Sequence, residues 1–460
     1  MTDAAHYRRE LSRVVSGRVW IVAVDVLFSA VHTATLLLEL GATRVLAIGG
    51  SRGVGELNDD PRIERVDLGL HAKDMMDGIR VSEAVLEDLP PEVQAKVEAF
   101  DPKREAKVIR ALFSSGEPVG GRAVFGGRRA SWVALEDKTI IDSFWDAAGV
   151  TRSPRQVVPL AGEALMRAHA QLDAGRGTVW VADNRDGWHG GAHFLRWVRS
   201  EEDAREARDF LGQCADSVRI MPFLDGLSCS IHGIVFEDSV IAFRPCEMLV
   251  FRVPGQSHLA YAAAATFWLP EPEQTEAMRE VAFRVGKHLR ETVDYRGAFT
   301  VDGIMTDEGF RPTELNPRYG AALARLAAGE PELPLYLLHL AMVEGCDLDY
   351  RPDELETLVL EASMRLPTGR GGRVLPKRVD EQRAAGLVRD ERSGLRFREE
   401  GEVAAIDVRL GPATAGSYLI LEVNAETVPF GPPIGPLMVE AFRLLDAAWD
   451  LGIGPLEAAG

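Results

Sequence analysis

The stretch from Tyr295 to Gly320 constrains the fold of this chain more than any other. Two alternating, strand-like runs flank the turn 306–309, which is the pattern of a β-hairpin. Side chains two positions apart on a strand share a face, so Glu314 and Asn316 are expected to point the same way. The hairpin brings Asp302 near Glu314 on the partner strand. Two carboxylates and an amide oxygen are therefore expected to converge.

This hairpin predicts a metal site formed by Asp302, Glu314 and Asn316. Oxygen donors of this kind suit a hard cation, and Mg²⁺ typically bridges such groups to phosphate. Carboxylates alone repel phosphate, so the site suits nucleotide chemistry only with metal present. The alternative is a solvated hairpin with a polar face. The spacing, the turn and the following Arg318 together favour the metal site.

Composition excludes several classes of protein. The chain has 460 residues, too many for one ordinary core and consistent with about three domains. Its 52 basic and 70 acidic residues give a net charge of −18, which argues against nucleic acid or an anionic membrane as a partner. Four cysteines without C-x-x-C spacing indicate reduced thiols. The apolar stretch 19–47 is interrupted by charges, so it predicts a strand and a helix in a cytoplasmic protein.

The pattern along the chain predicts a mixed α/β protein. Residues 19–24, 27–40 and 44–48 indicate a strand, a helix and a second strand, the start of a βαβ unit. Helical patterns then cover 91–100 and 105–113. The middle of the chain predicts helices at 135–149, 203–211, 276–293 and 333–343, and strands at 178–181, 194–198, 218–224 and 228–236. After about residue 348, short strands with glycine-rich turns lead to a last helix at 437–449.

Three further segments have a functional and a structural interpretation. The glycine-rich loop 186–191 could close over phosphates with its backbone N–H groups, although most such loops are only turns. Lys138 at a helix start is by itself expected to be a surface charge, and its functional interpretation depends on the family resemblance given below. The apolar segment 221–224 could meet an adenine edge or belong to a core.

Two motifs compete with this interpretation. Glu422 and Asn424 form a second Glu-x-Asn, with Asp407 upstream, and represent a rival metal site or a domain-packing strand. The run 49–55 resembles the glycine turn of short-chain dehydrogenases, but it follows the second predicted strand, and no Tyr-x-x-x-Lys accompanies it.

In this order, the motifs over residues 131–344 resemble the ATP-grasp superfamily. The resemblance implies an ATP-grasp fold with an N-terminal Rossmann-like domain (1–128), a nucleotide-binding and catalytic domain (129–345) and a small C-terminal α+β domain (346–460). It implies ATP and Mg²⁺ as cofactors, Arg318 as a catalytic residue and Asp302, Glu314 and Asn316 as metal ligands. The implied ATP-binding residues are Lys138, Gly187, His189, Gly190, Gly191, Met221, Phe223 and Leu224.

Segments such as 222–226 with 230–233 further resemble the pheganomycin-type peptide ligases. The implied activity is ATP-dependent joining of a carboxylate to an amine through an acyl phosphate, on an amino acid or peptide. His232, Arg244 and Glu247 are candidates for the substrate pocket. The sequence leaves the oligomeric state open, with a homodimer the commonest outcome.

Two departures from the family pattern concern the ATP site. Ala182 and Asp183 stand where relatives have a lysine, and Met221 stands where many have a glutamate. Replacement by Arg185 is one explanation. The alternatives to a ligase are a catalytically degenerate ATP-binding protein and a dinucleotide-dependent oxidoreductase.

Overall fold

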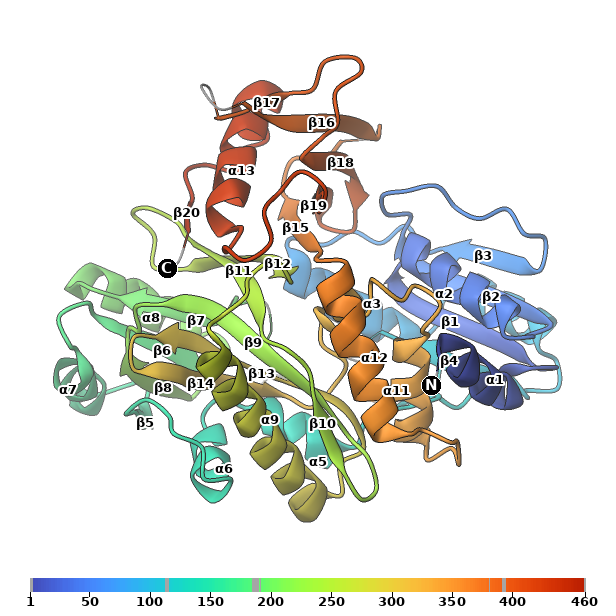
Figure 1. Ribbon diagram of the computed structural model, residues 1–460, viewed down its shortest axis with the longest axis horizontal. Helices are drawn as coiled ribbons and strands as arrows, with labels where there is room; N and C mark the ends of the chain where they lie inside the picture. Colours follow the sequence, from blue (N-terminus) through green and yellow to red (C-terminus); the bar gives the residue numbers. More distant parts are fainter. Residues whose placement is uncertain are drawn as a thin grey trace.

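The protein is described by a computed structural model that covers residues 3–111, 116–183, 190, 192–379, 381–390 and 394–458. Within these ranges, three β-sheets organise the molecule (Figure 1). A parallel sheet belongs to the N-terminal part of the chain, a small antiparallel sheet to the middle, and a large sheet extends from the middle into the C-terminal part.

The N-terminal sheet has the order β3-β2-β1-β4 and is parallel throughout. The predicted strand–helix–strand start is confirmed by β1 (Val19–Val26), α2 (Leu27–Glu39) and β2 (Arg44–Ser51). The sheet is completed by β3 (Ile63–Asp67) and β4 (Lys107–Arg110), and the helices around it are α1 (Ala4–Val15), α3 (Met75–Glu87) and α4 (Pro91–Phe100).

The helix predicted at 105–113 is wrong, because residues 107–110 form β4. This strand pairs with β1, and its Val108 and Ile109 are buried. Two adjacent β-branched residues between charged neighbours fit a short buried strand better than a helix.

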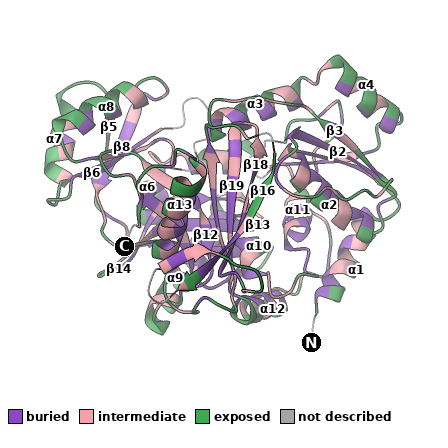
Figure 2. Cartoon of the chain, turned by 90° about the horizontal axis from the view of Figure 1, so that it is seen from above, coloured by how far each residue is buried: buried purple, intermediate pink, exposed green. Residues whose placement is uncertain are grey.

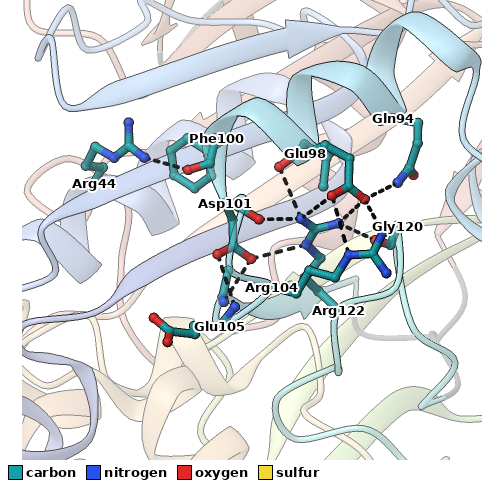
Figure 3. A network of polar contacts seen from close by, with 11 residues as sticks. Arg44, Gln94, Glu98, Phe100, Asp101, Arg104, Glu105, Gly120 and Arg122 are labelled. Atoms are coloured by element: carbon teal, nitrogen blue, oxygen red, sulfur yellow. Dashed lines mark hydrogen bonds and ion pairs between the residues drawn. The ribbon is translucent and has the colours of Figure 1, made fainter.

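A buried arginine fastens the loop that leaves this sheet. Arg122 is 1% exposed, and its guanidinium lies between Glu98 and Asp101 of the α4 region (Figure 3). It also donates to the Gly120 and Asp101 carbonyl oxygens. Because every face of the guanidinium meets an acceptor, this buried charge is compensated.

The small sheet has the order β5-β8-β6-β7 and is antiparallel. Two helices, α7 and α8, pack on it and share a core with Trp180 and Ile220. The elements of this part are α5 (Ala130–Val133), η1 (Ala134–Glu136), α6 (Ile141–Ala147), β5 (Gln156–Pro159), α7 (Glu163–Leu172), β6 (Thr178–Ala182), β7 (Leu195–Val198), α8 (Glu201–Leu211) and β8 (Ser217–Pro222).

The large sheet runs in the order β14-β13-β9-β11-β12-β15-β19-β18-β16-β17, with β10 beside β9 and β20 beside β11. Pairing of Ala265 with Gly369 links its middle and C-terminal parts. Its strands are β9 (Leu227–Val235), β10 (Val240–Ala242), β11 (Cys246–Arg252), β12 (Leu259–Ala265), β13 (Gly297–Thr306), β14 (Gly309–Asn316), β15 (Gly369–Leu375), β16 (Arg383–Asp390), β17 (Gly394–Phe397), β18 (Ile406–Ala413), β19 (Gly416–Val423) and β20 (Glu457–Ala458).

Helices cover this sheet and connect it to the N-terminal part. The predicted amphipathic helix is α9 (Pro272–Val293), which buries Met278, Val285 and Leu289 in a core with Phe299. Figure 2 shows buried residues, in purple, along the strands, and exposed residues, in green, on the outer faces of the helices. The remaining helices are α10 (Leu323–Leu326), α11 (Leu335–Glu344), α12 (Pro352–Arg365) and α13 (Gly435–Trp449).

Two more helix predictions need correction. The helix predicted at 135–149 is divided into η1 and α6, so Lys138 lies in the turn between them. The sequence pattern also missed α12, whose polar residues hide a stripe formed by Leu355, Val359 and Ala362. None of the helices in the described ranges is long and apolar enough to span a membrane.

Candidate active site

A cavity of about 350 Å³ lies between the small and the large sheet. The small sheet contributes an apolar wall that includes Val179, Val181 and Met221. The large sheet contributes polar groups that include Asp302 and Glu314. The cavity therefore has one face suited to an apolar ring and another suited to charge.

The predicted hairpin is present as β13 and β14, and Asp302 lies directly opposite Glu314. Asn316 Nδ2 donates to Asp302 Oδ2 at 2.8 Å. Asn316 Oδ1 in turn accepts from Arg318 Nη2 at 2.9 Å. The structure thus brings together all four residues that the sequence singled out on this segment.

Cations surround the carboxylates of the hairpin. Lys138 Nζ lies 3.0 Å from Glu314 Oε1, although the two residues are far apart in the sequence. Arg318 Nε lies 3.2 Å from Glu136 Oε1, and Arg128 also pairs with Glu136. The turn between η1 and α6 therefore places Lys138 at the hairpin. Glu136, at the end of η1, holds Arg318 beside it.

The carboxyl of Asp302 holds a proton more strongly than usual. Burial, followed by the charge of Glu314, raises its pKa to about 7, against the opposing effects of Arg318, Lys138 and Asn316. Two carboxylates that face each other in a partly buried site repel each other when both are charged. A bound cation would remove this repulsion.

The donor set fits a hard metal ion such as Mg²⁺. Two carboxylates and one amide oxygen lie together, and Mg²⁺ usually takes one or two carboxylates and completes its shell with water and phosphate oxygens. In the described part of the chain, no group of three or more His, Cys, Asp or Glu side chains is arranged to hold a metal. The residues present therefore suit a metal that a substrate helps to bind.

The predicted adenine segment lines the apolar wall of the cavity. Met221, Phe223 and Leu224 belong to one small hydrophobic cluster with Val179 and Val181. The Phe223 ring stacks on Trp197 with 4.2 Å between ring centroids. Of the predicted phosphate loop, Gly190 lines the cavity. Gly187, His189, Gly191 and the suggested replacement Arg185 lie outside the described residues.

Arg219, which no sequence pattern singled out, is 1% exposed and lines the same cavity. It lies two residues before Met221, on the same strand face. Its Nε and Nη2 donate to Asp142 at 2.7 and 2.8 Å, while Nη1 lies 3.1 Å from Met221 Sδ. A lone arginine in an apolar run carries no pattern, so only the fold reveals this cation.

The lysine that the ATP-grasp resemblance leads us to expect at Ala182 or Asp183 is absent from these two positions. Ala182 is buried, and Asp183 accepts hydrogen bonds from the backbone N–H groups of Asp216 and Ser217. Asp183 therefore closes a turn and adds no positive charge to the cavity.

The structure places the three candidates for the substrate pocket in different surroundings. His232 is buried and lines the cavity, and burial lowers its pKa to about 3, so its ring is neutral near pH 7. Arg244 and Glu247, which the sequence also suggested for the pocket, are not among the residues that line this cavity. Arg244 donates to Ser363 and to backbone carbonyl oxygens, and Glu247 accepts from the N–H groups of Ile434 and Gly435. Both residues hold α12 and α13 in place.

The rival Glu-x-Asn has different neighbours. Glu422 lies opposite Asp407, as Glu314 lies opposite Asp302, but Arg409 pairs with its carboxylate. Asn424 lies beyond the end of β19, where its Oδ1 accepts from Glu426 N and its Nδ2 donates to the Ala404 carbonyl oxygen. The amide is used by a turn and does not join the two carboxylates.

The glycine run 49–55 lacks the geometry of a dinucleotide turn. In that motif a glycine turn leads into a helix whose N-terminus faces the pyrophosphate. Here the glycines end β2, and the chain then continues to β3 without an intervening helix. The structure therefore offers no support for the oxidoreductase alternative at this position.

No protein-family model and no curated protein sequence matches this chain. Solved structures are similar to it in fold. Biotin carboxylase of Campylobacter jejuni, solved as a β,γ-ATP complex, matches with a TM-score of 0.57 and 13% identity over 97% of this chain and 93% of its own. The biotin carboxylase domain of the Hydrogenobacter thermophilus 2-oxoglutarate carboxylase, bound to ADP, magnesium and bicarbonate, matches with a TM-score of 0.53 and 14% identity over 96% and 91%.

An ADP complex of N5-carboxyaminoimidazole ribonucleotide synthetase also matches, with a TM-score of 0.50 and 13% identity over 94% of this chain and 98% of its own. At such low identity these matches establish the fold and not the reaction. The chain has the ATP-grasp fold, as the motifs of its middle part had implied.

Proposed function

We propose that this protein is an ATP-dependent ligase that joins a carboxylate to an amine, and that its substrate is an amino acid or a peptide. The observation that carries the proposal is the convergence of Asp302, Glu314 and Asn316 with Lys138 and Arg318 at one cavity of an ATP-grasp fold. The apolar wall on the opposite sheet supplies a place for the adenine ring.

The proposed reaction has two steps. A carboxylate oxygen of the acid attacks the γ-phosphorus, the bond from this phosphorus to the ADP oxygen breaks, and an acyl phosphate forms. The amine nitrogen then attacks the acyl carbon, phosphate leaves, and the amine loses a proton to form the amide. Mg²⁺ bound at Asp302, Glu314 and Asn316 would supply charge stabilisation for the phosphate oxygens.

The chain's own residues position and stabilise these groups. Lys138 would exchange its ion pair with Glu314 for a phosphate oxygen. Arg318 is held by Glu136 and Asn316, so it presents a fixed guanidinium to the acid or to the oxyanion formed when the amine attacks. Enclosure of the cavity by the two sheets would limit attack of water on the acyl phosphate.

A screen for hydroxamate formation tests the proposal without knowledge of the amine. Purified protein, ATP and Mg²⁺ are mixed with hydroxylamine and a panel of amino acids and short peptides as acids. An active acid gives a hydroxamate and an equal amount of ADP. With the acid labelled in its carboxylate by ¹⁸O, one labelled oxygen passes to the released phosphate.

One observation favours a second candidate, a nucleotide-binding protein without ligase activity. Asp183 replaces a phosphate-binding lysine with a turn-forming carboxylate. Stabilisation of the protein by Mg–ATP without ADP formation across the whole panel would support this candidate and contradict the ligase. No stabilisation by Mg–ATP at all would contradict both.

A further inference from the structure

A cluster of three arginines, Arg325, Arg370 and Arg409, lies where the large sheet passes from β12 to β15. None of the three is used in the proposed reaction. Thr368, just before β15, donates its hydroxyl to the Arg325 carbonyl oxygen at 3.4 Å. This contact places Arg325, on α10, beside the start of β15 and therefore beside Arg370. Arg370 lies opposite Glu422 of β19.

Positive charge exceeds negative charge in this cluster. Arg409 pairs with Glu422 Oε2, and Arg370 Nε lies 4.0 Å from Glu422 Oε1. Asp407, opposite Glu422, is the second carboxylate of this strand pair. With Arg325, three guanidinium groups meet two carboxylates. An excess of positive charge at a partly buried place is unexpected in a chain whose net charge is −18.

Arg325 is half-buried and lacks the acceptors that an arginine withdrawn from water needs. Its Nε is buried without a hydrogen-bond partner, as is the Nε of Arg370. No nitrogen of the Arg325 side chain makes a hydrogen bond or an ion pair with any residue that the structure describes. Burial and then the charge of Arg370 lower the pKa of Arg325. Holding a half-buried guanidinium without a hydrogen-bonded acceptor costs stability, so an anionic ligand is its natural complement.

The cluster lies beside the proposed active site. The segment 320–322 lines the cavity and leads directly into α10, which carries Arg325. Tyr261 of β12 also lines the cavity, and it lies close enough to both Asp302 and Arg325 for their charges to shift the pKa of its hydroxyl. A Cβ added at Gly372 would lie 2.2 Å from the hydroxyl of Tyr418, so Gly372 leaves room for this hydroxyl two residues after Arg370. A ligand group here would meet two guanidinium groups next to the reacting end of the cavity.

We propose that Arg325 and Arg370 bind an oxyanion group of the substrate, a carboxylate or a phosphate, other than the carboxylate that reacts. This inference rests on the proposed ligase function and narrows the substrate to a molecule with a second anionic group. Such a group would compensate the half-buried positive charge and fix the orientation of the acid or amine in the cavity.

Thermal unfolding with small anions tests the site. Wild type, Arg325→Met, Arg370→Met and the control Arg167→Met are compared, since Arg167 is a well-exposed arginine with only a 3.9 Å ion pair. Each protein is titrated with inorganic phosphate and with succinate at constant ionic strength. The titrations are run alone and with saturating Mg²⁺ and the non-hydrolysable analogue AMP-PNP, which occupies the phosphate positions of the nucleotide.

We expect at least one anion to raise the Tm of wild type and of Arg167→Met, with AMP-PNP present. In Arg325→Met and Arg370→Met the apparent Kd for this anion weakens by about tenfold or more, because a charge-assisted contact is lost. The Tm shift caused by Mg–AMP-PNP alone stays unchanged in both variants, which shows that they are folded. A Tm shift with phosphate but not with succinate indicates a phosphorylated substrate. A Tm shift with succinate but not with phosphate indicates a substrate with a second carboxylate.

Three outcomes separate the two proposals. If neither anion shifts the Tm of wild type, the anion site is overturned. Equal anion affinity in wild type, Arg325→Met and Arg370→Met overturns it as well. If Mg–AMP-PNP fails to stabilise wild type while the anion response depends on Arg325, the ligase proposal fails and the anion site remains.

Discussion

Two hairpins of this protein carry the same local pattern and have different surroundings. In the first, Asp302 faces Glu314 across β13 and β14, and in the second, Asp407 faces Glu422 across β18 and β19. The first hairpin joins its carboxylates to an asparagine and a lysine at the wall of a cavity. The second hairpin pairs its glutamate with arginines and uses its asparagine in a turn. A Glu-x-Asn motif thus acquires its chemistry from the side chains that the rest of the fold places around it.

The largest expected difference between the hairpins concerns the two glutamates. Glu314→Gln should lower hydroxamate formation by about 10²–10³-fold, because a charged ligand is lost from the Mg²⁺ that would stabilise the transferring phosphoryl group. Glu422→Gln should keep the Mg²⁺-dependent binding of ATP, measured by calorimetry. Loss of this binding in Glu422→Gln, with normal activity in Glu314→Gln, would exchange the roles of the two hairpins.

The cations that face the two glutamates should differ next. Lys138→Met should weaken Mg–ATP binding by about tenfold or more, since the Lys138 ammonium group lies 3.0 Å from Glu314 of the first hairpin and is placed to meet a phosphate oxygen there. Arg409→Met should leave the Mg–ATP dissociation constant unchanged within about twofold. Calorimetric titration of both variants gives the two constants, and an equal loss of affinity would show that the arginine side also contacts the nucleotide.

A smaller difference is expected in the dependence of stability on pH. The pKa of Asp302 is raised to about 7 in the folded protein, so its contribution to stability is present at low pH and is lost as pH rises from about 4 through 7. In metal-free protein, Asp302→Asn should flatten the fall in the free energy of unfolding between pH 5 and 7, by at most about 1.4 kcal/mol per pH unit. Urea unfolding at several pH values measures this slope. Asp407→Asn serves as the matched control, and an equal flattening by that variant would contradict the assignment.

The smallest expected effect belongs to Asn424. Asn424→Ala removes two hydrogen bonds of a turn and should lower the free energy of unfolding by about 1–2 kcal/mol. Mg–ATP binding should not change. A fall in nucleotide affinity without a fall in stability would mean that Asn424 contributes to a ligand site after all.

Much of the fold could be predicted because local patterns and tertiary structure agree there. The βαβ start, the long helix α9 and the hairpin of β13 and β14 follow from periodicity and turn residues. The exceptions are β4 and α12. At β4 the charged flanks obscured two buried β-branched residues, and at α12 polar residues obscured the apolar stripe that packs beside α10. Burial against distant elements, which a local pattern does not contain, decided both.

The sequence by itself determined the oxygen donors of the candidate site, because Asp302, Glu314 and Asn316 lie on two strands joined by a short turn and alternation fixes their common face. Only the tertiary structure brought Lys138 to Glu314, Glu136 to Arg318 and Arg219 to the apolar wall. It also moved Arg244 and Glu247 away from the cavity and surrounded Glu422 with arginines. The physical reason is range: strand alternation acts over two residues, whereas charge neighbours are set by the packing of sheets from different parts of the chain.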